Sequence, residues 1–160
     1  MRQLRQACGG MLAAAAALVS PHEAIAAPAS TSQAGPEVGP TLQELPPQRL
    51  AKGQCALAVW TLSDRRRVFM TLNNPAVGKL QINGATRELS RQGQAGAVVY
   101  GHAEHQTFAG DGITLTLDVE FDPDRRLLGG AMIRQGTLEL RAASGWTTMM
   151  PVGGLVACEP

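Results

Sequence analysis

The residues of this chain with the clearest potential for chemistry form one short cluster, His102-Ala103-Glu104-His105. Histidine and carboxylate side chains bind metals, but a zinc site needs three or four ligands in a tetrahedral arrangement. The H-x-x-H pair supplies at most two, and no spacing argues that Asp111, Asp118 or Glu120 supplies the others. The H-E-x-x-H order of a metalloprotease helix is absent. We expect polar residues of an exposed connection here, with no metal and no cofactor; a metal-dependent hydrolase using His102 and His105 is the alternative.

Nucleophilic and acid–base chemistry have no stronger basis in the sequence. Ser63, Ser90 and Ser144 lie in turn-like contexts, and no G-x-S-x-G elbow is present. Asp118 and Glu120 are two residues apart on an expected strand, so they share its solvent-facing side. Such a pair is compatible with a glycosidase, yet solvated charges on a strand face are far more common. The sequence identifies no reaction, and we expect a protein that is not an enzyme.

Strand and turn signals follow one another from about Leu50 to the end of the chain. Ile113–Phe121 alternates apolar and polar residues without a fault, which predicts a half-buried strand. Asn83-Gly84 separates two alternating segments and favours a two-residue hairpin turn, because both positions need positive φ. In that register Lys79 faces Glu88 and Gln81 faces Thr86, while Leu80 and Ile82 point toward the core.

The remaining segments complete an all-β pattern. We expect turns at Ser63–Arg66, Asp111-Gly112, Gln135-Gly136 and Ser144-Gly145, and core positions for Trp146, Met149 and Met150. No window after residue 30 sustains a helical stripe for more than two turns. Many short strands with regular turn signals predict a small antiparallel β-barrel or sandwich of about eight short strands. The order of the strands does not follow from the sequence.

The N-terminal segment 1–26 has the features of a secretory signal peptide. Arg2 and Arg5 precede an apolar run that is too short to span a bilayer, and the small-residue triplet Ala24-Ile25-Ala26 follows it. Residues 27–49 are rich in Pro, Ser and Gln, which predicts a flexible tether ahead of a single β domain at 50–160. We therefore expect a periplasmic or secreted protein that is not embedded in the membrane.

Cys55 and Cys158 are the only cysteines outside the signal segment, and they lie at opposite ends of the β domain. In an oxidising compartment they can pair, and a loop of about 100 residues closed in this way is stabilised by up to about 4–5 kcal/mol in the chain-entropy model. Two free thiols are the alternative.

Charge and composition exclude several partners. The chain has 14 Lys+Arg and 13 Asp+Glu, and 12 of each remain without the signal segment. A neutral chain has no electrostatic reason to bind nucleic acid or an anionic membrane surface. Aromatic residues make up 4% of the chain, too few for a platform that stacks nucleic-acid bases.

One stretch of the sequence resembles a known family. The hairpin at Asn83-Gly84 is followed by Leu89, Gly96-Ala97, Tyr100, Phe108, Gly110 and Leu115. In this order, between Leu80 and Leu117, they resemble the periplasmic and membrane-bound inhibitors of C-type lysozyme found in Gram-negative bacteria. The resemblance implies a small antiparallel β-barrel, a bond between a cysteine near its start and one near its end, and a loop that enters the lysozyme cleft.

The chain also departs from the family pattern. Ala95 stands where the family has the loop serine, and Tyr100 lies one residue further along. The lysine expected after the aromatic position is missing, because Phe108 is followed by Ala109-Gly110-Asp111. Several strands are also expected after Phe121.

These observations lead to a hypothesis of function by binding. We expect Gly93–Tyr100 to be a flexible, glycine-rich loop with Tyr100 as its anchor, in a chain otherwise poor in aromatic residues. Tyrosine offers a large contact area at low entropic cost. We expect Gly96, Ala97 and Tyr100 to contact a protein partner, with a lysozyme-type cell-wall hydrolase as the specific hypothesis. The alternative is a non-catalytic structural or assembly module of the cell envelope with an unknown partner.

Overall fold

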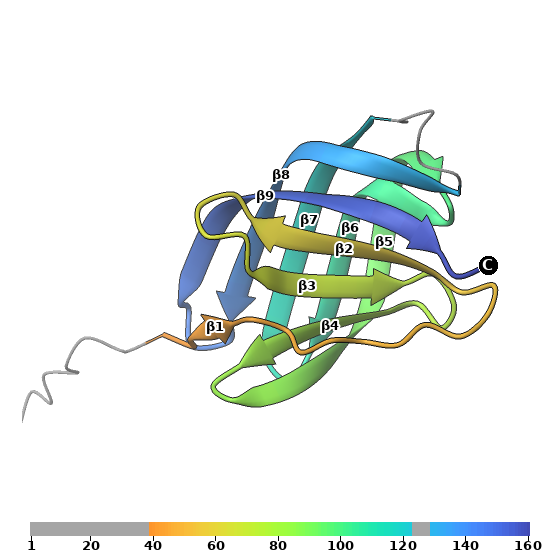
Figure 1. The fold of residues 1–160 in the computed structure, drawn as a ribbon. Helices are drawn as coiled ribbons and strands as arrows, with labels where there is room; N and C mark the ends of the chain where they lie inside the picture. Colours follow the sequence, from red (N-terminus) through yellow and green to blue (C-terminus); the bar gives the residue numbers. More distant parts are fainter. Residues whose placement is uncertain (1–38, 123–128) are drawn as a thin grey trace, which may run out of the picture. The chain divides into compact units, whose positions relative to one another are not determined.

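A computed structural model describes residues 39–122 and 129–160 of the chain. The predicted signal peptide, residues 1–26, and residues 27–38 lie outside the described part. All regular elements of the described part are strands (Figure 1). They are β1 (Leu42–Gln43), β2 (Cys55–Thr61), β3 (Arg67–Leu72), β4 (Val77–Ile82), β5 (Ala85–Val99), β6 (His102–Gly110), β7 (Ile113–Asp122), β8 (Gly130–Ala142) and β9 (Thr147–Cys158). No helix in these residues is long and apolar enough to cross a membrane.

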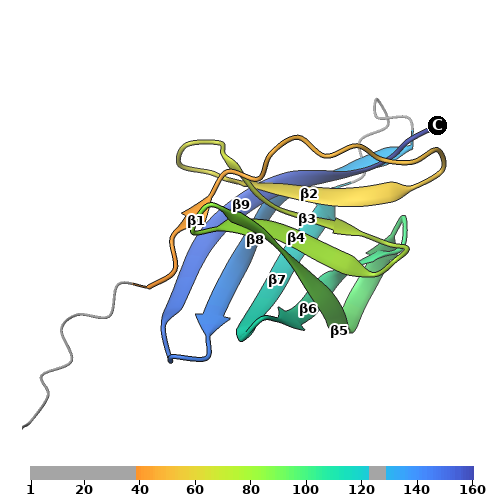
Figure 2. The same cartoon turned by 90° about the horizontal axis from the view of Figure 1, so that it is seen from below.

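The strands β2 to β9 form one closed antiparallel barrel. Each of these strands pairs with the next one in sequence. The ring closes because β9 pairs with the whole length of β2, from Cys55↔Cys158 to Thr61↔Val152. The view in Figure 2 shows the strands wrapping round a common interior. The all-β prediction is confirmed, and of the two architectures it left open, the structure is the barrel. An up-and-down barrel of this kind leaves few free sheet edges.

The predicted hairpin and alternating strand form the wall of this barrel as expected. Asn83 and Gly84 have φ values of 49° and 78°, and β4 pairs with β5 through Lys79↔Glu88 and Gln81↔Thr86. Leu80 is fully buried, and so are Leu115 and Leu117 on β7. The interior also contains Phe69 and Phe108, whose rings meet edge to face with centroids 5.1 Å apart.

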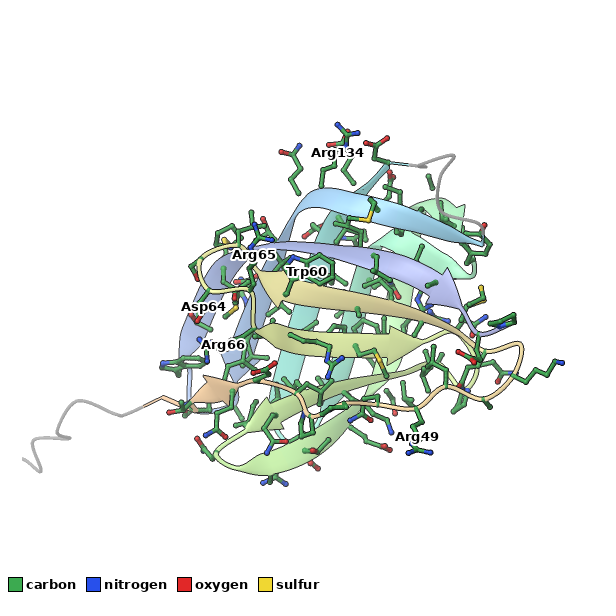
Figure 3. All side chains as sticks on the ribbon, in the orientation of Figure 1. Arg49, Trp60, Asp64, Arg65, Arg66 and Arg134 are labelled. Atoms are coloured by element: carbon green, nitrogen blue, oxygen red, sulfur yellow. A yellow bond between two sulfur atoms is a disulfide. The ribbon has the colours of Figure 1, made fainter. Side chains whose placement is uncertain are left out.

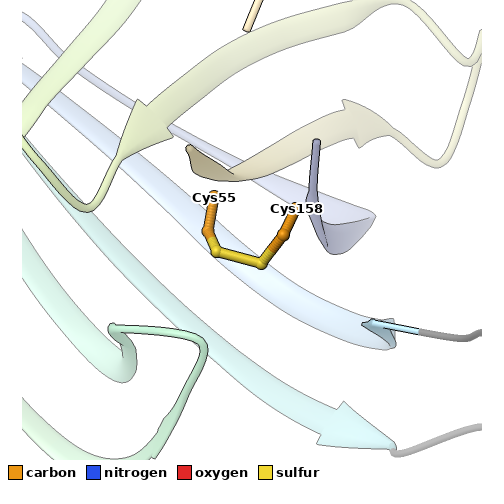
Figure 4. Close-up of a disulfide and its surroundings, with 2 residues drawn as sticks. All are labelled: Cys55 and Cys158. Atoms are coloured by element: carbon orange, nitrogen blue, oxygen red, sulfur yellow. A yellow bond between two sulfur atoms is a disulfide. The ribbon is translucent and has the colours of Figure 1, made fainter. Parts of the chain in front are cut away.

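The disulfide fastens the barrel at the point where the ring closes. Cys55 on β2 and Cys158 on β9 are direct register partners and are bonded to each other (Figure 4). They are 103 residues apart in the sequence. The bond therefore joins the first strand of the ring to the last, which confirms the predicted pairing.

Ahead of β2, the chain packs on the outside of the barrel along residues 39–50, which we call the strap. β1 pairs with β4 through Leu42↔Ile82, and the Leu45 amide donates a hydrogen bond to the Arg67 carbonyl at 2.7 Å. Leu45 is fully buried in a small cluster with Ala56, Met70 and Leu72. The fold thus begins earlier than residue 50, because one leucine of the proline-rich segment fills an apolar site on the outer face of β2 and β3.

Two other expectations differ from the structure. Gln135-Gly136 is not a turn; β8 continues through it, with a break in register between Ile133 and Gly136 in its pairing with β9. Met149 is not in the core but is 64% exposed, because it lies on the outward face of β9, whereas Met150 and Trp146 pack against the core.

Candidate protein-binding ribbon

At one end of the barrel, β5 and β6 leave their outer neighbours and pair only with each other. The pairing of β4 with β5 ends at Ser90, and the Arg91 amide makes the last hydrogen bond, to the Ala76 carbonyl at 3.1 Å. On the other side, the pairing of β6 with β7 begins at His105. We call residues 92–104, which form the end of β5, the turn and the start of β6, the ribbon. Its tip is two-stranded, with Val98↔Ala103 and Val99↔His102, whereas Gly93–Ala95 pair with residues of β6 that also pair with β7.

The ribbon corrects the prediction of a flexible loop at Gly93–Tyr100. All of this segment except Tyr100 belongs to β5, and it pairs with β6 through Gly93↔Thr107, Ala95↔His105 and Val98↔Ala103. The register shifts twice, between Arg91 and Gly93 and between Ala95 and Val98. Such bulges bend and twist a strand while most of its pairing is kept. The glycines therefore fit irregular points of a strand, and they do not signal an unstructured loop.

The outer part of the ribbon is exposed and has mostly small side chains. Residues 92–98 are all exposed, and the set includes the predicted contact residues Gly96 and Ala97. Val98 and Tyr100 are 58% and 42% exposed, which places them among the large apolar side chains open to solvent. Small side chains next to exposed apolar ones allow a partner to approach the backbone closely.

Glu104 holds the irregular part of the ribbon in place. Its Oε2 accepts a hydrogen bond from the Ala97 amide at 3.0 Å. The same side chain lies against Gly96, where an added Cβ would be 3.0 Å from Glu104 Oε2. Gly96 has a φ of 88°, so both conformation and space favour glycine at this position.

Tyr100 stands at the tip of the ribbon in a tight turn. Val99 pairs with His102, so Tyr100 and Gly101 alone form the connection, and both have positive φ, 49° and 80°. A non-glycine residue adopts this conformation only where its surroundings enforce it. Gly101 lies against Asn73 of the β3–β4 connection; a Cβ added at Gly101 would be 3.0 Å from the Cβ of Asn73. The structure thus brings the three predicted contact residues, Gly96, Ala97 and Tyr100, together on one preorganised hairpin.

Beneath the ribbon, three polar side chains enter the barrel interior. Arg91 follows the fully buried Leu89 by two residues, so the two share the inward face of β5. His102 and Gln106 share the inward face of β6 with Phe108, and all three are fully buried. Arg91 Nη1 donates to Gln106 Oε1 at 3.3 Å, and Gln106 Nε2 donates to the Ala103 carbonyl at 3.0 Å.

His102 is the feature that sequence reasoning missed. We had expected it in an exposed connection, but its side chain is buried and neither ring nitrogen has a hydrogen-bond partner. Burial lowers the pKa of His102 to about 4; the Cys55 backbone near the ring opposes this shift, and the charge of Arg91 adds to it. The period-two spacing from Phe108 through Gln106 back to His102 is the signal that places it inside.

The two histidines of the H-x-x-H cluster point to opposite sides of β6. His105 is exposed, and its Nδ1 is 2.5 Å from Asp118 Oδ1 on β7, whereas His102 is in the interior. An odd spacing on a strand has this result, so the pair does not converge on one ion. Within residues 39–122 and 129–160, no group of three or more His, Cys, Asp or Glu side chains gathers in a way that suits a metal.

The other carboxylates and cations of interest in the sequence lie away from the ribbon and bond to near neighbours. Glu120 Oε2 accepts from Gln135 Nε2 at 2.8 Å, on the outer face of β7 and β8. Figure 3 shows Asp64 and Arg66 at the β2–β3 turn. A hydrogen bond from the Thr61 hydroxyl, and then one from Arg66, lowers the pKa of Asp64 to about 2. Asp64 therefore compensates part of the positive charge of Arg65 and Arg66 in this turn.

Comparisons with known proteins add no relative to this picture. No family model, no curated protein and no solved structure matches the chain. The fold and the geometry of the ribbon are the basis for the functional proposal.

Proposed function

We propose that this protein is an exported binding domain that inhibits a lysozyme-type cell-wall hydrolase by placing the ribbon in its substrate cleft. The observation that carries the proposal is the ribbon itself, a hairpin exposed along residues 92–98 that ends in a half-exposed tyrosine at a constrained turn. The domain acts by binding and not by chemistry.

The shape of the ribbon suits a concave partner. A cleft admits a narrow two-stranded element more readily than the broad wall of a barrel. Gly96 and Ala97 keep the ribbon thin, and Tyr100 supplies a large apolar surface with a polar tip. Interfaces are commonly dominated by a few such aromatic anchors. Because the strand pairing and the Glu104 hydrogen bond already hold the ribbon, little entropy remains to be lost on binding.

The charge of the ribbon suits a glycosidase in particular. The clefts of these enzymes contain two catalytic carboxyl groups. Within the ribbon, residues 92–103 carry no Asp, Glu, Lys or Arg, and the one carboxylate, Glu104, accepts a hydrogen bond from the Ala97 amide. A single negative charge, already hydrogen-bonded to the backbone, therefore opposes entry of the ribbon into an acidic cleft. The Cys55–Cys158 disulfide is compatible with the oxidising compartment in which such hydrolases work.

An inhibition assay with variants tests the proposal. Purified protein is titrated into a C-type lysozyme assay, together with Tyr100→Ala, Ala97→Glu and the control Met149→Ala. Met149 is an exposed apolar residue on β9, away from the ribbon. We expect inhibition by the wild type and by the control. Loss of an interface anchor costs about 2 kcal/mol or more, so Tyr100→Ala should weaken inhibition by roughly thirtyfold, and Ala97→Glu should weaken it through repulsion.

The results separate the possible roles of the protein. Unchanged hydrolysis at micromolar wild-type protein would end the inhibitor proposal. Equal inhibition by Tyr100→Ala and Met149→Ala would show that the contact lies elsewhere on the barrel. Recovery of a resident envelope protein by pull-down, lost in Tyr100→Ala but not in Met149→Ala, would favour the envelope-assembly role and keep the ribbon as the contact surface.

A further inference from the structure

The polar side chains under the ribbon lack the partners that buried polar groups normally have. Arg91 is half-buried, and within the described residues no carboxylate lies within ion-pair distance of its guanidinium. Its one side-chain hydrogen bond in this part of the chain goes to the neutral Gln106. Glu104, the carboxylate of the ribbon, is hydrogen-bonded to the Ala97 amide. A cation that is partly withdrawn from water without a counter-charge is unusual in folded proteins.

His102 adds a second unsatisfied group at the same place. It is fully buried, and no hydrogen bond of normal geometry reaches either ring nitrogen, although the Cys55 backbone lies close enough to act on the ring. A neutral imidazole has one N–H donor and one acceptor nitrogen, and leaving them unpaired in an apolar interior costs free energy. Most buried polar atoms in native proteins have a partner, so an exception needs an explanation.

One kind of ligand can accept hydrogen bonds from both groups, from the guanidinium and from the one N–H of the neutral imidazole. We infer that Arg91 and His102 together bind a small oxyanion, a carboxylate or inorganic phosphate group, at the ribbon end of the barrel interior. The guanidinium supplies the counter-charge and a two-donor fork that matches an oxyanion. The imidazole N–H supplies a further donor. The interior of an eight-stranded barrel is wide enough to hold one small ligand or to be filled by side chains.

The surroundings of the two groups support this assignment. Gln106 is held by the Ala103 carbonyl and in turn accepts from Arg91 Nη1, which fixes the direction of the guanidinium. Arg91 is only partly buried, so part of this side chain is open to solvent, whereas His102 is fully buried. The inference stands apart from the proposed binding of a hydrolase, since it concerns the inward face of β5 and β6 and not the outer face of the ribbon.

Anion titrations with matched variants test the inference. Thermal unfolding and isothermal titration calorimetry are carried out with inorganic phosphate, acetate and chloride at constant ionic strength. The variants are Arg91→Gln and His102→Gln, with Arg87→Gln and His105→Gln as controls for an exposed cation on β5 and an exposed histidine on β6. We expect an oxyanion to raise the unfolding temperature of the wild type and of both controls. Affinity should fall roughly ten- to hundredfold in Arg91→Gln, the range for loss of a charge-assisted hydrogen bond.

A spectroscopic measurement keeps the test valid if a core variant does not fold. In wild-type protein with isotope-labelled histidine, the ring signals of His102 should shift on addition of phosphate or acetate, and those of His105 should not. Chloride separates an oxyanion site from simple screening, and comparison of phosphate with acetate shows which oxyanion is preferred. Unmoved His102 signals with every anion, or equal effects in Arg87→Gln and Arg91→Gln, would overturn the inference.

Discussion

The burial of His102 predicts a specific loss of stability in mild acid. The pKa of His102 is about 4 in the folded protein, compared with 6.5 for an ordinary histidine. The unfolded chain therefore binds more protons than the folded chain between these two values, and folding is weakened as the pH falls through that window. Above about pH 6.5 this residue makes no difference, because it is neutral in both states.

The size of the effect follows from the shift in pKa. One pKa unit corresponds to about 1.4 kcal/mol. His102 therefore lowers the free energy of unfolding by about 3 kcal/mol once the pH is below the pKa that it has in the folded protein. Most of this decrease in the free energy of unfolding, roughly 2 kcal/mol, occurs between about pH 7 and about pH 4.5. The lowered pKa of Asp64, about 2, places its own contribution at still lower pH. His102 and Asp64 therefore affect the stability of the protein in different pH ranges.

Urea unfolding at about pH 7 and about pH 4.5, in buffer without phosphate or carboxylate, measures this prediction. Wild type and His102→Leu are compared, with His105→Leu as the control for an exposed histidine on the same strand. The free energy of unfolding should fall with pH in the wild type and in His105→Leu, and should fall by roughly 2 kcal/mol less in His102→Leu. An equal fall in all three proteins would refute the argument that buried His102 is the source.

Other predictions concern the packing of the barrel. Leu45→Ala should lower stability by about 2–4 kcal/mol in urea unfolding, because Leu45 belongs to the strap and is fully buried against β2 and β3; an effect below about 0.5 kcal/mol would mean that the strap is not part of the fold. Gly78→Ala should cost about 1–3 kcal/mol, since its Cβ would lie 2.4 Å from Phe69 Cζ, whereas Gly93→Ala has nothing within 4 Å and should be nearly neutral; equal effects would contradict the packing. Replacing Cys55 and Cys158 together by alanine should lower stability by about 2–4 kcal/mol, and an unchanged urea midpoint would show that the bond adds nothing.

The parts of the fold that the sequence predicts are those where local chemistry and barrel geometry agree. Asn83-Gly84 supplies the two positive φ values of its turn, and the strict alternation of β7 matches a wall with one buried face. The cysteines lie at the ends of the domain, and a closed ring brings these ends together. Each of these features depends on neighbours in sequence or on one covalent bond.

The strap and the ribbon could not be predicted in the same way, because each depends on distant pairing. Leu45 is a single apolar residue among prolines, and only the cluster on β2 and β3 makes it buried. Gly93, Ala95 and Gly96 have weak strand propensity, so their place in β5 follows from the complementary edge of β6. His102 was assigned to a connection because its neighbours are polar, although its even spacing from Phe108 places it inside.

The most direct test of the account is to map which residues of the protein contact a C-type lysozyme. Isotope-labelled protein is titrated with a C-type lysozyme, and backbone amide signals are followed by NMR. If the ribbon enters the cleft, the perturbed signals should be concentrated in residues 92–104 and strongest near Gly96, Ala97 and Tyr100. Perturbations centred on the outer face of β8 and β9, or none at concentrations that saturate the enzyme, would contradict the account.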